Sequence, residues 1–108
     1  MYCAHIATFH NYTDGELFVA TFPTGWKVSR EVIKSTKVPS KGIATTSMTS
    51  LEGCFMAFLI KSLSGSAKNK SEFVFVEKSD RCNSDIDLYI NYNLQQQIFD
   101  IRSSAIGS

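Results

Sequence analysis

The chain has 108 residues, the size of one small domain, and we expect residues 1–108 to form a single unit with one modest core. Hydrophobic residues make up 44% of it, aromatic residues 12% and charged residues 19%, a composition typical of a globular protein with a weakly charged surface. Eleven Lys and Arg stand against ten Asp and Glu. Proteins that grip nucleic-acid phosphates usually carry a clear basic excess, so this balance argues against that class.

The cysteines are few and widely spaced, at Cys3, Cys54 and Cys82. An odd number without a Cys-x-x-Cys pair does not fit the usual zinc pattern and indicates a reducing compartment. The first ten residues lack the basic and apolar regions of a secretory signal, and the apolar stretch 54–60 is much shorter than a membrane span. We therefore expect a cytoplasmic protein that has no membrane partner.

The chain begins with two predicted strands. Residues 2–9 and 16–22 are rich in β-branched and aromatic side chains. Asp14-Gly15 between them is a strong turn signal, because glycine accepts positive φ without steric cost. Residues 2–22 are therefore predicted to form a β-hairpin.

A third strand and a loop are predicted next. Apolar and polar residues alternate over 26–33, the period of a half-buried strand. Residues 34–47 are polar and contain one proline and one glycine, which favours a loop with at most a short strand near Val38 or Ile43.

The strongest helical pattern in the sequence covers residues 49–63. Thr49 and Glu52 have the spacing of a capping box, in which each side chain bonds the backbone amide of the other residue. The apolar residues that would share one helical face are Leu51, Phe55, Phe58, Leu59 and Leu63. The pattern predicts a helix packed on a sheet, with Phe55, Phe58 and Leu59 largely buried.

Two more strands and a closing helix are predicted after it. Residues 73–76 are a continuous apolar run, typical of a central strand buried on both faces. Residues 86–92 alternate and predict a half-exposed strand. Asn93 would cap a short helix with an apolar face formed by Leu94, Ile98 and Ile101. The order β-β-β-α-β-β-α predicts an α+β domain with a single mixed, mainly antiparallel sheet.

Three short stretches resemble the acidic motifs of ribonuclease H-like proteins. They are Tyr-Thr-Asp-Gly with Asp14, the helix start with Glu52, and Val-Phe-Val-Glu-Lys-Ser-Asp with Asp80 or Glu77, over about residues 2–80. The resemblance implies a ribonuclease H-like fold in which Asp14, Glu52 and Asp80 are the catalytic residues and metal ligands. In that family such carboxylates hold two Mg²⁺ or Mn²⁺ ions that cleave a phosphodiester.

Each acidic residue also has an ordinary structural explanation. Asp14 fits a turn, Glu52 fits the second half of the capping box, and Asp80 fits a solvated loop. The remaining candidates are single residues: His5 and His10 lie five apart, on opposite faces of one strand, and Cys82 lies in a polar loop beside an arginine, where a thiol would be accessible.

The sequence thus favours a small intracellular binding or regulatory protein, of the kind found in phages and other mobile elements, that acts on a protein partner without a cofactor. Aromatic residues would anchor the contact, and strand 86–92, at a sheet edge, would pair with the partner or with a second copy. The alternative is a ribonuclease H-like nuclease dependent on Mg²⁺ or Mn²⁺ that cleaves an RNA–DNA hybrid or another nucleic acid, or an inactive relative.

Overall fold

The computed structural model of the chain describes residues 2–22, 34–51, 56–76 and 85–106. These residues form eight β-strands, and none of them lies in a helix. The expected α+β class is therefore wrong, and the described part of the chain is all-β. The strands are β1 (Tyr2–Asn11), β2 (Leu17–Phe22), β3 (Lys34–Val38), β4 (Ile43–Leu51), β5 (Met56–Ser62), β6 (Ser71–Val76), β7 (Asp85–Asn93) and β8 (Ile98–Ile106).

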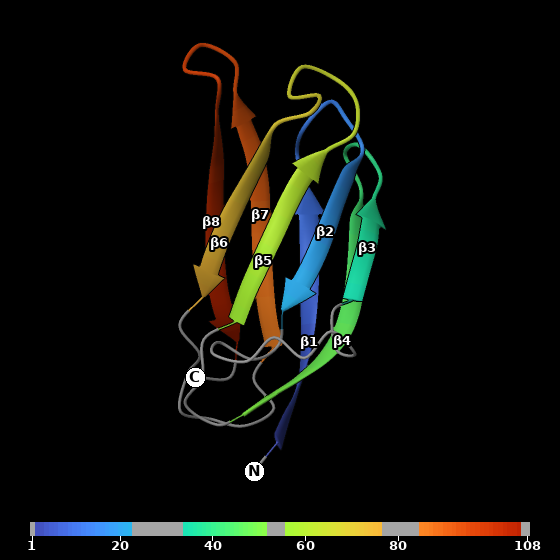
Figure 1. Cartoon of the computed structure of the whole chain (residues 1–108), viewed down its shortest axis with the longest axis vertical. Helices are drawn as coiled ribbons and strands as arrows, with labels where there is room; N and C mark the ends of the chain where they lie inside the picture. The colour runs from blue at the N-terminus through green and yellow to red at the C-terminus, as the bar shows by residue number, and fades with distance from the viewer. Residues whose placement is uncertain (1, 23–33, 52–55, 77–84, 107–108) are drawn as a thin grey trace.

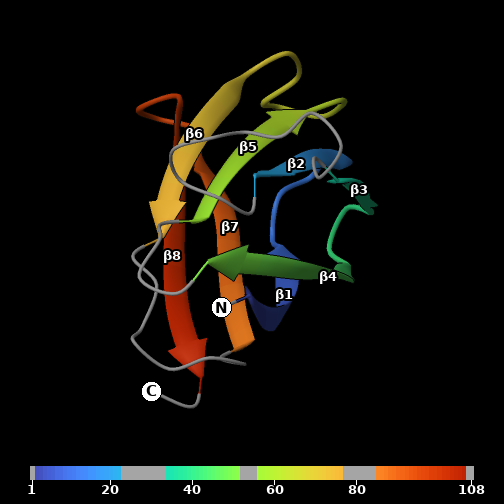
Figure 2. The ribbon, with the colours of Figure 1, turned by 60° about the horizontal axis from the view of Figure 1, so that its bottom comes forward.

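The strands form a sandwich of two four-stranded sheets (Figure 1). The front sheet in Figure 1 has the order β3-β2-β5-β6, and the back sheet has the order β4-β1-β7-β8. Neighbouring strands are antiparallel except β1 and β7, which run parallel. Seen from below, β3 and β4 lie together at one side of the sandwich and β6 and β8 at the other (Figure 2).

The core forms because successive side chains of a strand point to opposite faces. Where the structure describes side chains of β1, β2, β5 and β7, alternate residues point between the sheets, and most of these are buried and apolar. The ring of Phe9 from the back sheet meets the ring of Phe58 from the front sheet edge to face, with centroids 5.7 Å apart. The inward apolar side chains of these four strands are Ala7, Phe9, Leu17, Val19, Phe58, Ile60, Ile86, Leu88 and Ile90.

The buried side chain of Asn11 connects two loops at the end of the sandwich that is uppermost in Figure 1. Asn11, which is 2% exposed, donates through Nδ2 to the carbonyl oxygens of Gly15 at 2.9 Å, Val38 at 3.2 Å and Pro39 at 3.0 Å. Its Oδ1 accepts from the backbone amide and the hydroxyl of Thr13. Asn11 therefore bonds backbone groups of both the β1–β2 and the β3–β4 connections and holds the two together.

The β1–β2 connection also packs against the β5–β6 connection. A Cβ added at Gly15 would lie 1.9 Å from the carbonyl oxygen of Ser64, so no larger residue fits there without a shift. The amide of Leu63 donates to the carbonyl oxygen of Glu16 at 2.8 Å. Gly15 is thus required by a close backbone approach. The connection crosses from one sheet to the other, so the predicted hairpin over residues 2–22 is wrong, although both of its strands exist.

The helix predicted for residues 49–63 is wrong. Thr49 lies in β4, in register with Ala4 of β1, and β5 begins at Met56. Glu52 lies outside the described residues. The prediction failed because β5 is apolar on both faces, and a continuous apolar run has no period that separates a strand from a helix. The ribonuclease H-like architecture needs this helix, so that expectation is wrong as well.

Two further expectations about secondary structure are wrong. The closing helix is absent, because residues 94–97 form the turn of the β7–β8 hairpin and β8 follows. Asn93 does act as a cap, since its Oδ1 accepts the amides of Gln95 and Gln96, but it caps a turn. Residues 34–47, expected to be mainly loop, contain all of β3 and more than half of β4.

The positions of two correctly predicted strands differ from expectation. Residues 73–76 belong to β6, which is an edge strand with exposed side chains and not a central one. Residues 86–92 belong to β7, and Ile86, Leu88 and Ile90 of the predicted apolar side are buried. This strand lies between β1 and β8, so the edge pairing expected for residues 86–92 is wrong. The strand predicted over 26–33 lies outside the described residues.

Candidate interaction surface on the front sheet

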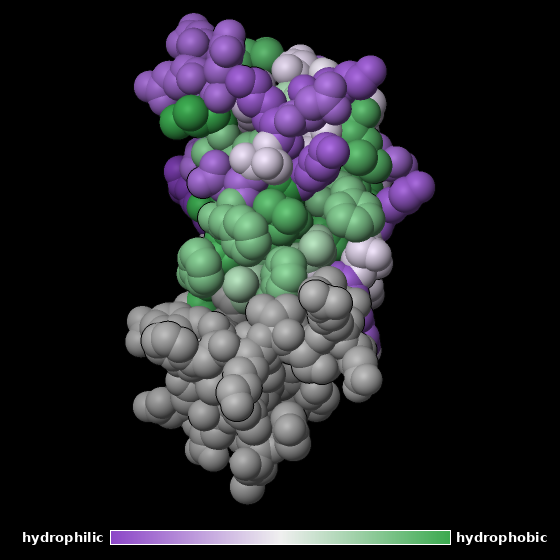
Figure 3. Space-filling view, viewed as in Figure 1, coloured by the Kyte–Doolittle hydropathy of each residue, from purple (hydrophilic) through white to green (hydrophobic). Residues whose placement is uncertain are grey.

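The outward face of the front sheet is apolar across three neighbouring strands. The strand registers place Phe18 of β2 opposite Lys61, Leu59 of β5 opposite Phe73, and Ala57 opposite Phe75. Figure 3 shows the resulting hydrophobic area in the middle of the molecule. We call this area the aromatic face and define it as Phe18, Ala20, Phe22, Ala57, Leu59, Phe73 and Phe75.

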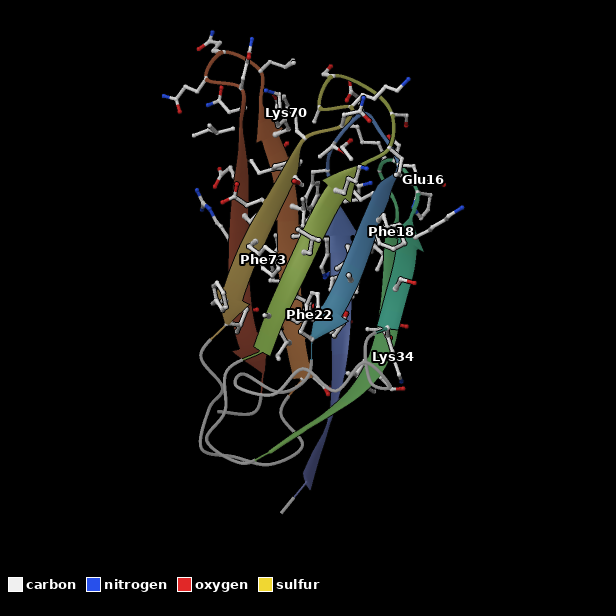
Figure 4. The ribbon with its side chains drawn as sticks, in the orientation of Figure 1. Glu16, Phe18, Phe22, Lys34, Lys70 and Phe73 are labelled. Carbon is white, nitrogen blue, oxygen red and sulfur yellow. The ribbon has the colours of Figure 1, made fainter. Side chains whose placement is uncertain are left out.

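Three phenylalanine rings of this face lie close to one another, and two of them are more than half exposed. Phe73 is 52% exposed and Phe75 is 70% exposed. The ring of Phe73 lies 5.8 Å from that of Phe22 on β2 and 6.0 Å from that of Phe75, centroid to centroid. Figure 4 shows Phe18, Phe22 and Phe73 spread over the front sheet. Outward positions of a solvated antiparallel sheet are normally polar, so this face has the character of an interface.

Two lysines border the aromatic face at one end. Lys37 of β3 and Lys61 of β5 lie opposite Phe18 on either side, and both are exposed. Lys34 of β3 is not part of this border, because its Nζ donates to the carbonyl oxygen of Ser47 in the back sheet at 2.6 Å. The aromatic face therefore combines an apolar centre with a locally positive border.

The outward face of the back sheet differs from the aromatic face, because polar groups dominate it. His10 of β1 and Asp87 of β7 are joined through Nε2 and Oδ1 at 2.8 Å, and the imidazole also stacks on Tyr89 with centroids 4.4 Å apart. A shallow hollow beside them holds about 210 Å³. Both aromatic and hydrogen-bonding side chains line it. The residues that line the hollow are Tyr12, Tyr89, Asn91, Asp100 and Arg102.

Of the three acidic residues singled out in the sequence, the structure describes only Asp14. It lies in the β1–β2 connection, and its carboxylate accepts from the backbone amide of Ser66 at 2.9 Å and from the hydroxyl of the same residue. These two bonds, the hydroxyl first, lower the pKa of Asp14 below its ordinary value of 3.8, and Lys41 adds a smaller effect. Asp14 thus holds the β5–β6 connection in place, whereas its structural explanation placed it in the turn of a hairpin that does not form.

The other predicted site residues are not brought together by the described structure. Glu52, Glu77, Asp80 and Cys82 lie outside the described residues. Within ranges 2–22, 34–51, 56–76 and 85–106 there is no group of three or more His, Cys, Asp or Glu side chains that could hold a metal ion. His10 points outward and bonds Asp87, a residue whose place on the polar side of its strand was visible in the alternation of residues 86–92.

Sequence reasoning missed the exposure of Phe73 and Phe75. Their run was interpreted as a doubly buried strand, whereas the two residues share the outward side of β6 and the valines between and after them point inward. One signal was available: Ser71 and Glu72 begin the strand with polar residues, which is common for an edge strand and rare for a central one.

No protein-family model matches this chain, and no curated protein sequence matches it. None of the described residues belongs to a helix that is long and apolar enough to cross a membrane.

Proposed function

We propose that this protein is a small binding or regulatory module that acts by covering a protein partner with its aromatic face. The observation that carries the proposal is that apolar side chains fill the outward positions of β2, β5 and β6, with Phe73 and Phe75 more than half exposed. Contiguous exposed apolar area of this kind on a small protein is typical of an interaction site. Interfaces are enriched in aromatic residues, which often carry most of the binding energy.

The physical gain comes from removing the rings from water. Burying a phenylalanine side chain fully contributes about 1.5–3 kcal/mol, and the exposed fractions of Phe73 and Phe75 leave half or more of that gain unrealised in the free protein. Phe22 and Leu59 lie beside them and would extend the dry centre of the contact.

The border of the face indicates the chemistry of the partner. Lys37 and Lys61 flank Phe18, so a partner that places acidic side chains around an apolar centre is the best match. Charges at the rim of an interface mainly affect the association rate and its salt dependence. We therefore expect association to slow as ionic strength rises. We also infer a reducing, cytoplasmic setting, which the odd and widely spaced cysteines favour.

A pair of matched variants tests the proposal. Phe18→Glu removes an apolar anchor from the aromatic face and places a carboxylate between two lysines, which should keep the strand folded. Ile43→Glu makes the same kind of change on the back sheet, at a side chain that is 61% exposed. Both variants should melt within a few degrees of the parent protein.

Immobilised parent protein and the Ile43→Glu variant should then capture the same partner from a cytosolic extract, and the Phe18→Glu variant should lose it. The captured partner, once purified, should bind more slowly in high salt. Equal capture by all three proteins would mean that the aromatic face is not the contact. Binding of the parent protein to vesicles of anionic lipid, lost in Phe18→Glu, would replace the protein partner with a membrane surface and contradict the proposal.

A further inference from the structure

The two sheets have four edges. The edge strands β3 and β8 carry charged residues, and β4, which has none of its own, is contacted by a lysine of β3. β3 carries Lys34 and Lys37, and the ammonium group of Lys34 binds the Ser47 carbonyl of β4. β8 carries Asp100 and Arg102, both exposed. Charged side chains at an edge are a common way to block pairing with another chain.

The fourth edge of the described sheets, β6, has less of this protection. Its sequence Ser-Glu-Phe-Val-Phe-Val contains a single charge, Glu72, and its first three residues and Phe75 are exposed. Short segments of high β-propensity and low charge at an open edge are templates for another strand. β6 is thus the edge at which a strand from outside can join the sandwich.

The register shows which backbone groups of β6 are free. The amide of Ser62 donates to the carbonyl oxygen of Lys70 at 2.9 Å, so the backbone of residue 70 faces β5. Backbone groups of successive residues in a strand point to alternate sides. Those of Glu72 and Val74 therefore also face β5, whereas those of Phe73 and Phe75 point away from it, to the open edge.

We propose that two copies of this chain join through β6, paired antiparallel about a two-fold axis at Val74, so that the two front sheets become one continuous sheet. In this register Phe73 lies opposite Phe75 of the second copy, and the free amides and carbonyls of both residues pair directly. Glu72 lies opposite Val76 of the second copy, so no like charges face one another. The segment is therefore complementary to itself.

Pairing also brings the two aromatic faces together. Phe73 and Phe75 are on the outward side of β6, and their rings already lie 6.0 Å apart. The same two residues of the second copy would lie beside them across the axis, so four rings would meet at the centre of the joined sheet. An isologous contact of this kind closes after two copies, and the guarded β3 edges lie at the outer ends of the joined sheet. A dimer is expected, and not a fibre.

The first test uses the intact chain and two variants at one position. Phe75→Pro removes an amide that points to the open edge, so it should leave the pairing with β5 intact and block a new strand. Phe75→Thr removes the same ring but keeps the amide and a residue suited to strands. By sedimentation velocity, the parent protein should be a dimer at about 100 μM, well above the dissociation constant expected for a specific contact. Phe75→Pro should raise the dissociation constant by at least about 100-fold, and Phe75→Thr by about tenfold or less.

The second test fixes the register and does not depend on the proline variant folding. Opposite residues at a non-hydrogen-bonded antiparallel site have Cα atoms about 4.5 Å apart, within the range that a disulfide spans. Val74→Cys should therefore crosslink to its own counterpart under mild oxidation, with the 74–74 bond identified by peptide mass mapping. Glu72→Cys is the matched control, because its counterpart would lie about 13 Å away along the strand.

A parent protein that stays monomeric at about 100 μM, or a Val74→Cys variant that crosslinks no better than Glu72→Cys, would overturn the dimer. So would a dimer that persists unchanged in Phe75→Pro. These outcomes leave the proposed partner binding untouched, because capture that depends on Phe18 is measured separately. The dimer in turn survives if no partner is captured.

Discussion

His10 and Asp87 join the first strand of the chain to the seventh, through an imidazole–carboxylate contact of 2.8 Å across the parallel β1–β7 pair. His10 lies opposite Tyr89, and Asp87 lies opposite Thr8. The two side chains therefore occupy successive positions on the same face of the sheet. Their side chains are 18% and 12% exposed, so the contact is partly shielded from water. The early and late parts of the sequence are thus tied directly on the outer face of the back sheet.

A double-mutant cycle should detect this tie. A partly shielded hydrogen bond to a carboxylate contributes more than an exposed one, so we expect a coupling energy of about 0.5–1.5 kcal/mol between His10→Ala and Asp87→Ala. The measurement is the free energy of unfolding in urea for the parent, both single variants and the double variant. The cycle removes the separate effect of stacking on Tyr89. Strictly additive single variants would show that the contact contributes nothing to stability.

Asn11 should be among the least replaceable polar residues. Asn11→Asp exchanges a donor for a carboxylate that faces three carbonyl oxygens, and we expect it to lower the free energy of unfolding at neutral pH by about 3 kcal/mol or more. Asn11→Ala should cost about 1–3 kcal/mol, because buried carbonyls lose their donor. Asn93→Ala is the control, since Asn93 is exposed and bonds only its own turn. Equal losses of unfolding free energy at Asn11 and Asn93 would contradict the role of Asn11 in holding the two connections together.

Asp14 should make stability depend on pH in the acid range. Its pKa in the folded protein lies below 3.8, because Ser66 donates two hydrogen bonds to the ionised carboxylate. Below that value the unfolded chain binds more protons than the folded one, so stability increases with pH there. The contribution is complete above the ordinary value and is lost as pH falls through the lowered pKa. Asp14→Asn and Ser66→Ala should both flatten the acid limb of a melting-temperature profile, and an unchanged limb in both variants would rule the linkage out.

Sequence patterns predicted strands well where one face of the strand is polar. Residues 86–92 alternate in sequence, and β7 covers them with Ile86, Leu88 and Ile90 buried between the sheets. The pattern failed where both faces are apolar. Residues 56–62 place Phe58 and Ile60 in the core and Ala57 and Leu59 on the aromatic face, which removes the period of two. The apolar outward side of β5 belongs to the aromatic face, which is proposed to bind the partner. The same apolar side is the reason why sequence patterns did not predict this strand.

Strand pairing could not be predicted from local sequence either. The chain does bend at Asp14-Gly15, but a bend between two strands does not specify whether they share a sheet. Here the close approach of Gly15 to Ser64 and the hydrogen bonds of Asn11 direct the chain across to the other sheet. The parallel pairing of β1 with β7 joins residues about 80 apart, and such long-range contacts leave no local signal.

Thr21 should be improved by an apolar replacement. Its side chain is fully buried between the sheets, and its Oγ1 has no hydrogen-bond partner among the described residues. A buried hydroxyl without a partner costs about 1–3 kcal/mol, and valine has nearly the same shape. Thr21→Val should therefore raise the free energy of unfolding by about 1 kcal/mol in chemical denaturation. Thr21→Ser is the control, because it keeps the hydroxyl and loses a methyl group, and should be destabilising. A loss of stability in Thr21→Val would show that the hydroxyl is satisfied in solution.

Adjacent residues of β5 should respond very differently to truncation, because a strand sends them to opposite faces. Phe58 is fully buried and meets Phe9 across the sandwich, so Phe58→Ala should cost about 3–5 kcal/mol. Leu59 points to the aromatic face and is only partly buried, so Leu59→Ala should cost less than about 2 kcal/mol. The partner-binding assay should show the reverse order when both variants are assayed well below their melting temperatures, with capture lost in Leu59→Ala and kept in Phe58→Ala. In a helix both side chains would share the buried face, and similar large losses of stability at both positions would contradict the strand and the aromatic face together.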